Sequence, residues 1–394
     1  MSSVARNGHA AMSDLSPLSR VKRKSDFGAV RSAFDPTRTL GLVEHRSIFL
    51  LNRAFDFPGA RCVLSDERVE RRPAAVLAAD VAEADEANAE PVLQDMAART
   101  ELHSIDTLTL SDTQFLRGDA NGKATTTSGQ LRLAKSSGRS PVVVLQHGSG
   151  GMAPNVDMWA RELNKIGVST FALDGFTGRG LTEVNTNQAL LGRLNFILDI
   201  YRALDVLANH PSVDPARIAL MGFSRGGQAA LYASLKRFHR LWNKSGAEFA
   251  AYVPFYPDCM TTFLSDTDVV GRPIRIFGGT QDDYNPIAAC KAYVERLRAA
   301  GADIEVTEYP NASHAFDNPL GAQPAMVQPR FQSVRNCKIQ EEADGLLINT
   351  DTKQPFAFTD ACVVHGVHTG HDPVATREAK QAVKGLLKKV FQLH

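Results

Sequence analysis

The segment GFSRGG at 222–227 places Ser224 at the centre of a G-x-S-x-G pattern. An apolar run at 218–221 precedes it, and a segment of helix-forming composition at 228–238 follows it. A serine on a sharp strand-to-helix turn, with glycines on either side, stands exposed above a sheet as a nucleophile. A glycine-rich turn with an incidental serine is the alternative. The flanking strand and helix favour the nucleophile elbow, so Ser224 is the predicted nucleophile.

A serine hydroxyl is a weak nucleophile unless a base takes its proton and an acid orients that base. Candidates follow Ser224 in the chain order serine, acid, histidine that sheet hydrolases use. Asp282 is the predicted acid, with Asp283 as the second candidate, and His314 is the predicted base. Each comes directly after a predicted strand. The alternatives are a solvated turn before a helix for the aspartates and a loop histidine without a role for His314.

A glycine-rich loop, QHGSGG at 146–151, follows another predicted strand. Glycines allow backbone N–H groups to approach a ligand oxygen, and the amides of Ser149 and Arg225 are the predicted oxyanion hole. Losing one such donor costs about 3 kcal/mol of transition-state stabilisation. His147 is expected to orient the loop by hydrogen bonding rather than to act as a base. His147 and Gly150 are also candidate substrate contacts.

Two weaker features lie elsewhere. Arg179, in the loop at 174–180, could bind a substrate carboxylate bidentately, although a flexible surface loop is an equally good interpretation. His365, His368 and His371 suggest a metal site, but they occupy a glycine-containing loop without acidic or cysteine partners. The sequence therefore predicts no metal site.

Strand and helix patterns alternate from about residue 103 onward, which predicts an α/β fold with a mostly parallel sheet covered by helices on both faces. Predicted strands lie at 105–110, 130–133, 141–145, 168–173, 217–221, 249–255, 274–277 and 304–309. Predicted helices lie at 156–166, 188–209, 228–238, 286–300 and 375–391. Residues 320–372 interrupt this alternation and are predicted to be a loop-rich insertion. The acid, the base and the nucleophile all fall where strands end, at the edge where open sheets bind ligands.

Taken together, the motifs resemble the dienelactone hydrolase family of α/β-hydrolases. The resemblance covers roughly residues 100 to 320 and the final helix. It implies an α/β-hydrolase domain over 101–394 that cleaves a small ester or lactone, without a metal or organic cofactor, through an acyl-enzyme. An aspartate four residues before a proline matches the family's acid, which favours Asp282. The residues that carry the resemblance are HGSGG at 147–151, GFSRGG at 222–227, GTQDD at 279–283 with Pro286, and SHAF at 313–316.

One departure from the family pattern concerns the nucleophile. The best-known dienelactone hydrolases carry a cysteine at the elbow position, where this chain has Ser224. The chain is therefore similar to the serine-nucleophile branch, and dienelactone itself is doubtful as the substrate. Acyl transfer or peptide hydrolysis on the same triad stays an alternative, as does a non-catalytic binding protein with this fold.

The composition is that of a soluble globular protein, with 43% hydrophobic and 22% charged residues in a chain of 394. A net charge of +1 gives no electrostatic basis for binding nucleic acid or an anionic membrane. No apolar run approaches the roughly 18 residues that span a bilayer. The expected partner is a small-molecule ester or lactone, and the sequence leaves the oligomeric state open.

Five cysteines bear on the compartment. Their spacing does not match a zinc site. Without a recognisable export signal, a cytoplasmic protein with buried free thiols is slightly favoured. The alternative is an oxidising compartment, in which Cys259 would pair with Cys290 and Cys337 with Cys362.

Residues 1–100 form a predicted N-terminal extension with a different composition. It is basic and serine-rich at 19–24, then alanine-rich and acidic at 73–90. Without a sustained amphipathic period it is expected to be disordered or weakly structured. Translation could instead begin at Met96. We expect no catalytic role for this extension, although an interaction role remains an alternative reading.

Overall fold

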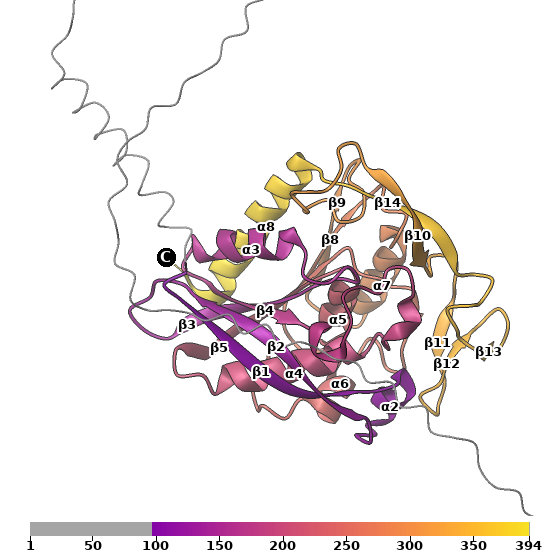
Figure 1. Cartoon of the computed structure of the whole chain (residues 1–394), viewed down its shortest axis with the longest axis horizontal. Coiled ribbons are helices and arrows are strands. Elements are labelled where there is room, and N and C mark those ends of the chain that lie inside the picture. The colour runs from indigo at the N-terminus through magenta and orange to yellow at the C-terminus, as the bar shows by residue number, and fades with distance from the viewer. Residues whose placement is uncertain (1–96, 394) are drawn as a thin grey trace, which may run out of the picture. The chain divides into compact units, whose positions relative to one another are not determined.

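The computed structural model describes residues 97–393 (Figure 1). The predictions made for residues 1–96 of the N-terminal extension lie outside the described residues, as does Cys62. Within the described part, no helix is long and apolar enough to span a membrane.

An eight-stranded sheet forms the centre of the domain, with β1 at one edge and β9 at the other (Figure 1). The pairs β1–β2 and β2–β4 are antiparallel, and the other neighbours are parallel. The prediction of a mostly parallel sheet is therefore confirmed. In spatial order the strands are β1 (Arg99–Thr109), β2 (Lys123–Leu133), β4 (Ser169–Asp174), β3 (Ser140–Gln146), β5 (Val213–Phe223), β6 (Tyr252–Phe255), β8 (Ile274–Gly279) and β9 (Ile304–Tyr309).

Helices cover both faces because the central strands are apolar on both sides. In β3, Val142 and Val144 belong to one buried cluster, whereas Val143 and Leu145 belong to another. Residues of α2, α4, α5, α6 and α7 join the first cluster, and those of α3 and α8 join the second. The helices are α2 (Asp112–Arg117), α3 (Pro154–Asn164), α4 (Asn195–Ala208), α5 (Arg225–Tyr232), α6 (Lys236–Trp242), α7 (Ile287–Ala299) and α8 (Pro373–Phe391), with short 3-10 turns at Thr177–Arg179 and Gln188–Leu190.

Two predicted helices differ from the structure. The segment 188–209 divides into the 3-10 turn and α4, and 228–238 divides between α5 and α6. Gly192 lies at the first break, where a Cβ atom would be 2.8 Å from the Asp112 carboxylate. Close packing of the chain against α2 therefore interrupts a pattern whose composition alone favours one helix.

The predicted loop-rich insertion contains more strand than expected. Its strand β10 (Met326–Ser333) pairs with β14 (Val364–Thr369) in an antiparallel ribbon. A second small sheet joins β7 from the main domain to three short strands of the insertion. Those strands are two or three residues long, too short to show a period in the sequence. They are β7 (Thr261–Thr262), β11 (Ile339–Glu341), β12 (Leu347–Asn349) and β13 (Gln354–Pro355).

Both cysteine pairs are joined as disulfides, Cys259 to Cys290 and Cys337 to Cys362. The slight preference for free thiols was therefore wrong, and the alternative pairing is the observed one. The first bond fastens the segment after β6 to α7, and the second closes the insertion. In the chain-entropy description, a loop of such length contributes about 3.5 kcal/mol to stability. The bonds fit an oxidising compartment, but they do not identify one.

Candidate active site

Ser224 occupies a tight turn between the end of β5 and the start of α5. Its φ of 54° and ψ of −115° lie in a region that residues with side chains rarely adopt. The neighbours leave no room for side chains. A Cβ atom at Gly222 would lie 2.0 Å from the carbonyl oxygen of Gly226, and one at Gly226 would lie 2.2 Å from that of Gln146. The strained geometry has the form expected for a nucleophile elbow.

His314 lies between Ser224 and Asp282. Its Nε2 is 2.9 Å from Ser224 Oγ, and its Nδ1 is 2.8 Å from Asp282 Oδ2. The other carboxylate oxygen of Asp282 accepts the backbone N–H groups of Tyr284 and Asn285 at 2.9 and 2.8 Å. A carboxylate held in this way keeps the proton on Nδ1, which leaves Nε2 to accept the serine proton. Histidine and aspartate are both buried.

Asp283, the second candidate for the acid, faces a different group. Its carboxylate accepts the backbone N–H and the Nδ1–H of His368, at 2.7 and 2.9 Å. It also lies 3.7 Å from the Arg335 guanidinium. The acid in contact with His314 is therefore Asp282, while Asp283 connects the acid loop to strand β14 of the insertion.

Two tyrosines that the sequence analysis did not identify hold the imidazole of His314. The rings of Tyr256 and Tyr284 each have their centroid 4.7 Å from that of His314. The Tyr256 hydroxyl donates to buried Asp317 at 2.6 Å, and the Tyr284 hydroxyl accepts from Gln188 Nε2 at 2.9 Å. Tyr256 directly follows β6, and Tyr284 lies two residues after Asp282. Their positions beside a strand end and beside the acid are the signal that could have identified them.

The predicted oxyanion amides lie on two connected segments. Arg225 is the first residue of α5, where an N–H group has no acceptor within the helix. Its buried guanidinium contacts Ser149 Oγ at 3.4 Å, Gln188 Oε1 at 2.6 Å and the Leu191 carbonyl at 2.9 Å. Burial and the nearby Arg193 lower the pKa of Arg225 to about 9. The side chain, whose role the sequence did not show, therefore fastens the Ser149 loop to the elbow.

His147 also orients the oxyanion loop at 146–151. It is fully buried, accepts the Gly175 N–H on Nε2 at 3.1 Å and donates from Nδ1 to the Gly148 carbonyl at 2.7 Å. Burial lowers its pKa to about 4, so the ring is neutral near pH 7. His147 does not line the cavity beside Ser224, so the prediction of a substrate contact there is wrong. Its two hydrogen bonds agree with the predicted role of orienting the loop. Gly150 does line that cavity.

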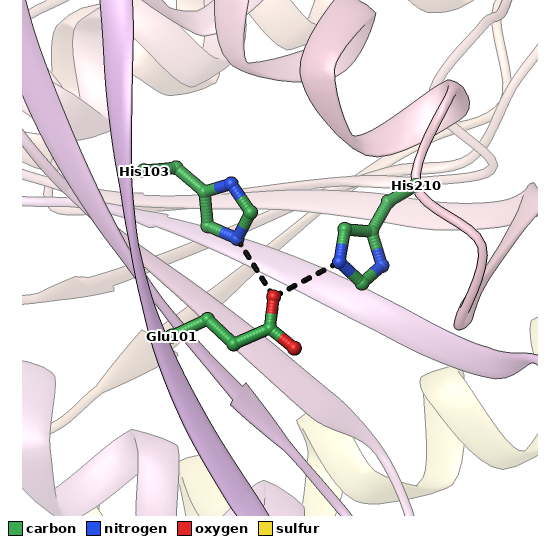
Figure 2. A group of neighbouring side chains, drawn as sticks. All are labelled: Glu101, His103 and His210. Carbon is green, nitrogen blue, oxygen red and sulfur yellow. Dashed lines mark hydrogen bonds and ion pairs between the residues drawn. The ribbon is translucent and has the colours of Figure 1, made fainter.

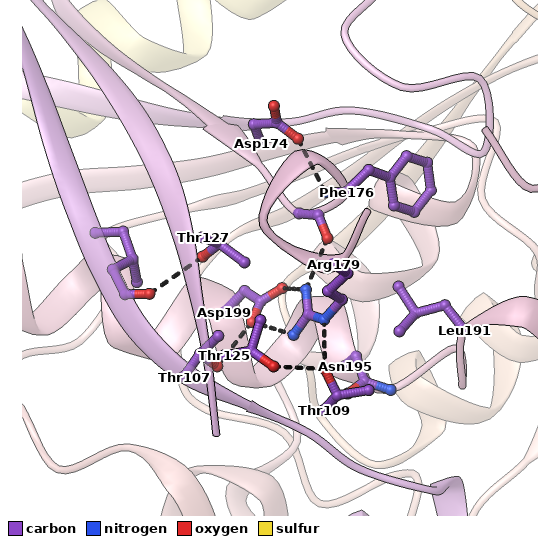
Figure 3. Close-up of polar contacts among 12 residues, drawn as sticks. Thr107, Thr109, Thr125, Thr127, Asp174, Phe176, Arg179, Leu191, Asn195 and Asp199 are labelled. Atoms are coloured by element: carbon purple, nitrogen blue, oxygen red, sulfur yellow. Dashed lines mark hydrogen bonds and ion pairs between the residues drawn. The ribbon is translucent and has the colours of Figure 1, made fainter. Parts of the chain in front are cut away.

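Arg179 does not face the cavity, and the prediction of a substrate contact there is wrong. Figure 3 shows its guanidinium directed at Asp199 of α4. The two Arg179–Asp199 contacts measure 2.6 and 2.9 Å, and the Nε donates to Thr109 Oγ1 at 2.9 Å. Both side chains of the ion pair are almost entirely buried. The arginine therefore joins the 3-10 turn at Thr177–Arg179 to the edge strand β1 and to helix α4.

This ion pair leads to a prediction about stability. We expect Arg179→Met to lower the free energy of unfolding by about 3 to 5 kcal/mol, because it leaves Asp199 buried without its cation. Urea unfolding of wild type and variant measures the change. The double variant Arg179→Met with Asp199→Leu should recover most of the loss, since no charge then stays buried. A single variant as stable as wild type would contradict this role.

The group best placed to hold a metal ion differs from the one considered in the sequence. Among the described residues, Glu101, His103 and His210 bring ligand atoms within 4.8 Å of one another (Figure 2). The Ser212 N–H donates to His210 Nδ1 at 3.2 Å, so Nε2 carries the proton and donates to Glu101 at 3.0 Å. Metal binding through Nε2 would require the ring proton to move to Nδ1, where the Ser212 N–H already donates. Hydrogen bonding therefore accounts for this cluster, which ties β1 to the segment after α4.

A cavity of about 320 Å³ opens beside Ser224 and His314. This volume suits a small molecule. The remaining lining comes mainly from the oxyanion loop, the start of α3, the two tyrosines, the segment after His314 and the insertion, with Asn185 and Phe223. These residues are Gly148, Ser149, Gly150, Gly151, Ala153, Asn155, Asn185, Phe223, Tyr256, Tyr284, Ala315, Asn318, Gly321, Gln328, Phe331, Thr369 and Gly370.

Comparison with known proteins gives a consistent result. The model of the dienelactone hydrolase family matches residues 128–342, more than half of the chain. A Yersinia pestis protein named "Putative carboxymethylenebutenolidase" is 27% identical over 192 residues, which cover 46% of this chain and 70% of that protein.

Solved structures are similar at lower identity. The crystal structure of a dienelactone hydrolase-like promiscuous phosphotriesterase from metagenomic libraries is 18% identical, covering 74% of this chain and 98% of that one, with a TM-score of 0.48. A thermophilic esterase of Thermogutta terrifontis is 17% identical, covering 49% of this chain and 79% of that one, with a TM-score of 0.40.

Proposed function

This chain belongs to the dienelactone hydrolase family of α/β-hydrolases, and from that membership we propose that it cleaves a small ester or lactone through an acyl-enzyme on Ser224. The observation that carries the proposal is the continuous series of contacts from Ser224 Oγ through His314 to Asp282. Ser224 and His314 line a cavity large enough for such a substrate.

The first half of the reaction forms the acyl-enzyme. Ser224 Oγ attacks the carbonyl carbon while His314 Nε2 takes the hydroxyl proton, and Asp282 stabilises the imidazolium. The carbonyl oxygen becomes an oxyanion, which the amides of Ser149 and Arg225 stabilise. When the bond to the leaving oxygen breaks, His314 returns the proton to it. An ester releases an alcohol, and a lactone keeps the new hydroxyl on the acyl chain.

The second half reverses these roles with water. His314 takes a proton from a water molecule whose oxygen attacks the acyl carbon, and then gives that proton to Ser224 Oγ as the acid leaves. Acyl transfer and peptide hydrolysis could use the same residues, but no feature of the described cavity favours them. The alternative of an interaction through the N-terminal extension lies outside the described residues.

Covalent labelling tests the proposal directly. We expect an alkyl fluorophosphonate to modify the wild-type protein once, at Ser224, because the probe captures a serine that an adjacent base activates. Mass spectrometry of the proteolytic peptide locates the adduct. The Ser224→Ala variant should fold, by circular dichroism, and stay unlabelled. A folded wild type that resists the probe and hydrolyses no ester would overturn the proposal.

A further inference from the structure

The walls of the cavity beside Ser224 are aromatic and amide-bearing, and they carry no ion pair. None of the described residues that line it is lysine, arginine, aspartate or glutamate. Its polar side chains include the amides of Asn185, Asn318 and Gln328, which are neutral donors and acceptors. The faces of Tyr284 and Phe331, with ring centroids 6.2 Å apart, extend an aromatic wall outward from His314.

Three arginines lie near this cavity, and each has other partners. Arg193 pairs with Asp258 beside a small adjoining cavity that Ser224 also lines. The guanidinium of Arg225 donates to Ser149 Oγ, Gln188 Oε1 and the Leu191 carbonyl. Arg335 donates to the backbone carbonyls of Asp283 and Gly366. None of these guanidinium groups lines the cavity of about 320 Å³. Arg193 and Arg225 line only the adjoining cavity, whose volume of about 10 Å³ holds no more than a water molecule, so they are not placed to meet an anionic group of a substrate.

The insertion forms the outer part of the wall. Gln328 and Phe331 belong to β10, and Gln328 Nε2 donates to Thr369 Oγ1 of β14 at 3.1 Å. The Gly370 N–H donates to the carbonyl of His314 at 3.1 Å. Two strands of the insertion are thus fixed directly over the triad, and they bring neutral groups to it.

An anionic substrate would fit this environment poorly. A carboxylate that leaves water needs a cation or several hydrogen-bond donors, and without them its burial is strongly unfavourable. The charge would also lie near the Asp282 carboxylate and near the oxyanion that forms during attack, and like charges repel strongly in a cavity with little water. An uncharged ester suffers neither penalty and can pack its hydrocarbon part on the aromatic wall.

Building on the proposed function, we propose that the substrate is an uncharged ester or lactone, and that Gln328 and Phe331 of the insertion determine this choice. Substrates with a carboxylate beside the scissile bond are excluded by the absence of a cation, and the position of Gln328 is where a cation would reverse the preference.

A pair of chromogenic esters tests the substrate class. We expect kcat/KM for 4-nitrophenyl hydrogen succinate, which is anionic at neutral pH, to be at least about 100-fold below that for 4-nitrophenyl butyrate. The methyl ester of the succinate is the control, because it keeps the length and removes the charge, and it should recover most of the activity. An anionic ester cleaved as fast as the butyrate would overturn the inference while leaving the proposed function intact.

A pair of variants tests the role of Gln328 in the choice of substrate. In Gln328→Arg, we expect the ratio of kcat/KM for the anionic ester to that for the butyrate to rise at least about 10-fold, since the guanidinium can pair with the carboxylate. Val327→Arg adds the same charge to the neighbouring residue, which is half exposed and does not line the cavity, and its ratio should stay near that of wild type. Equal shifts in both variants, or none in Gln328→Arg, would overturn the assignment. Failure of every ester together with failed fluorophosphonate labelling would instead count against the proposed function.

Discussion

The His314→Gln variant is expected to lower kcat for ester hydrolysis by about 10⁶-fold, because removing the base of a triad costs about as much as removing all three members. His314 Nε2 lies 2.9 Å from Ser224 Oγ, and a glutamine amide cannot take a proton at that place. Residual hydrolysis would come from the oxyanion amides and from binding alone. Steady-state and single-turnover kinetics with 4-nitrophenyl butyrate measure the loss.

A matched histidine provides the control for this variant. His365 is exposed on β14 of the insertion and does not line the cavity. The His365→Gln variant makes the same chemical change there and should retain wild-type kcat within about threefold, as surface substitutions usually do. Circular dichroism confirms that both variants are folded. If His314→Gln kept more than about one hundredth of the wild-type rate, His314 would not be the base.

The positions of the three triad candidates could be predicted because all follow strand ends. The triad candidates follow three strands: Ser224 follows β5, Asp282 follows β8 and His314 follows β9. These strands run parallel to one another, so their carboxyl ends meet at one edge of the sheet. Apolar runs mark those strands in the sequence. The predicted proximity of the three side chains therefore depended on strand direction, which the alternation of strands and helices indicates. That β5, β6, β8 and β9 are successive neighbours is shown by the structure.

The same rule misplaced Arg179, which also follows a strand end. Its partner Asp199 lies on α4, and nothing local to the loop shows that the guanidinium is directed inward toward that helix. The positions of Tyr256 and Tyr284 around His314 depend in the same way on packing between distant segments. Long-range side-chain pairing is therefore the part of the site that a single sequence does not determine.

The short strands of the insertion were difficult to predict from the sequence for a related reason. Strand β11 pairs with β7, more than seventy residues earlier in the chain, and each contributes only two or three residues. The disulfide from Cys337 to Cys362 closes this region, yet cysteine spacing alone could not choose between thiols and bonds. Elements held by distant pairing and covalent closure leave no periodic pattern, so the sequence predicts loop where these short strands lie.

Replacing Asp282 by asparagine is expected to lower kcat by about 10⁴-fold without unfolding the protein. The amide oxygen can still accept the two backbone N–H groups that Asp282 Oδ1 accepts now. Its NH₂ group would then face His314 Nδ1 and donate to it, which moves the ring proton to Nε2. A protonated Nε2 cannot accept the proton of Ser224, so attack becomes slow even though the geometry is kept.

The adjacent aspartate supplies the matched comparison. Asp283→Asn should weaken the contacts to His368 and Arg335, which connect the acid loop to the insertion. We therefore expect a higher KM from a less well-fixed cavity wall, with kcat lowered by less than about 10-fold, because His314 keeps its own carboxylate. Kinetics of both variants with the same ester separate the two roles. If Asp283→Asn lost as much kcat as Asp282→Asn, the contact between Asp282 and His314 would not be the one that sets the proton on the imidazole.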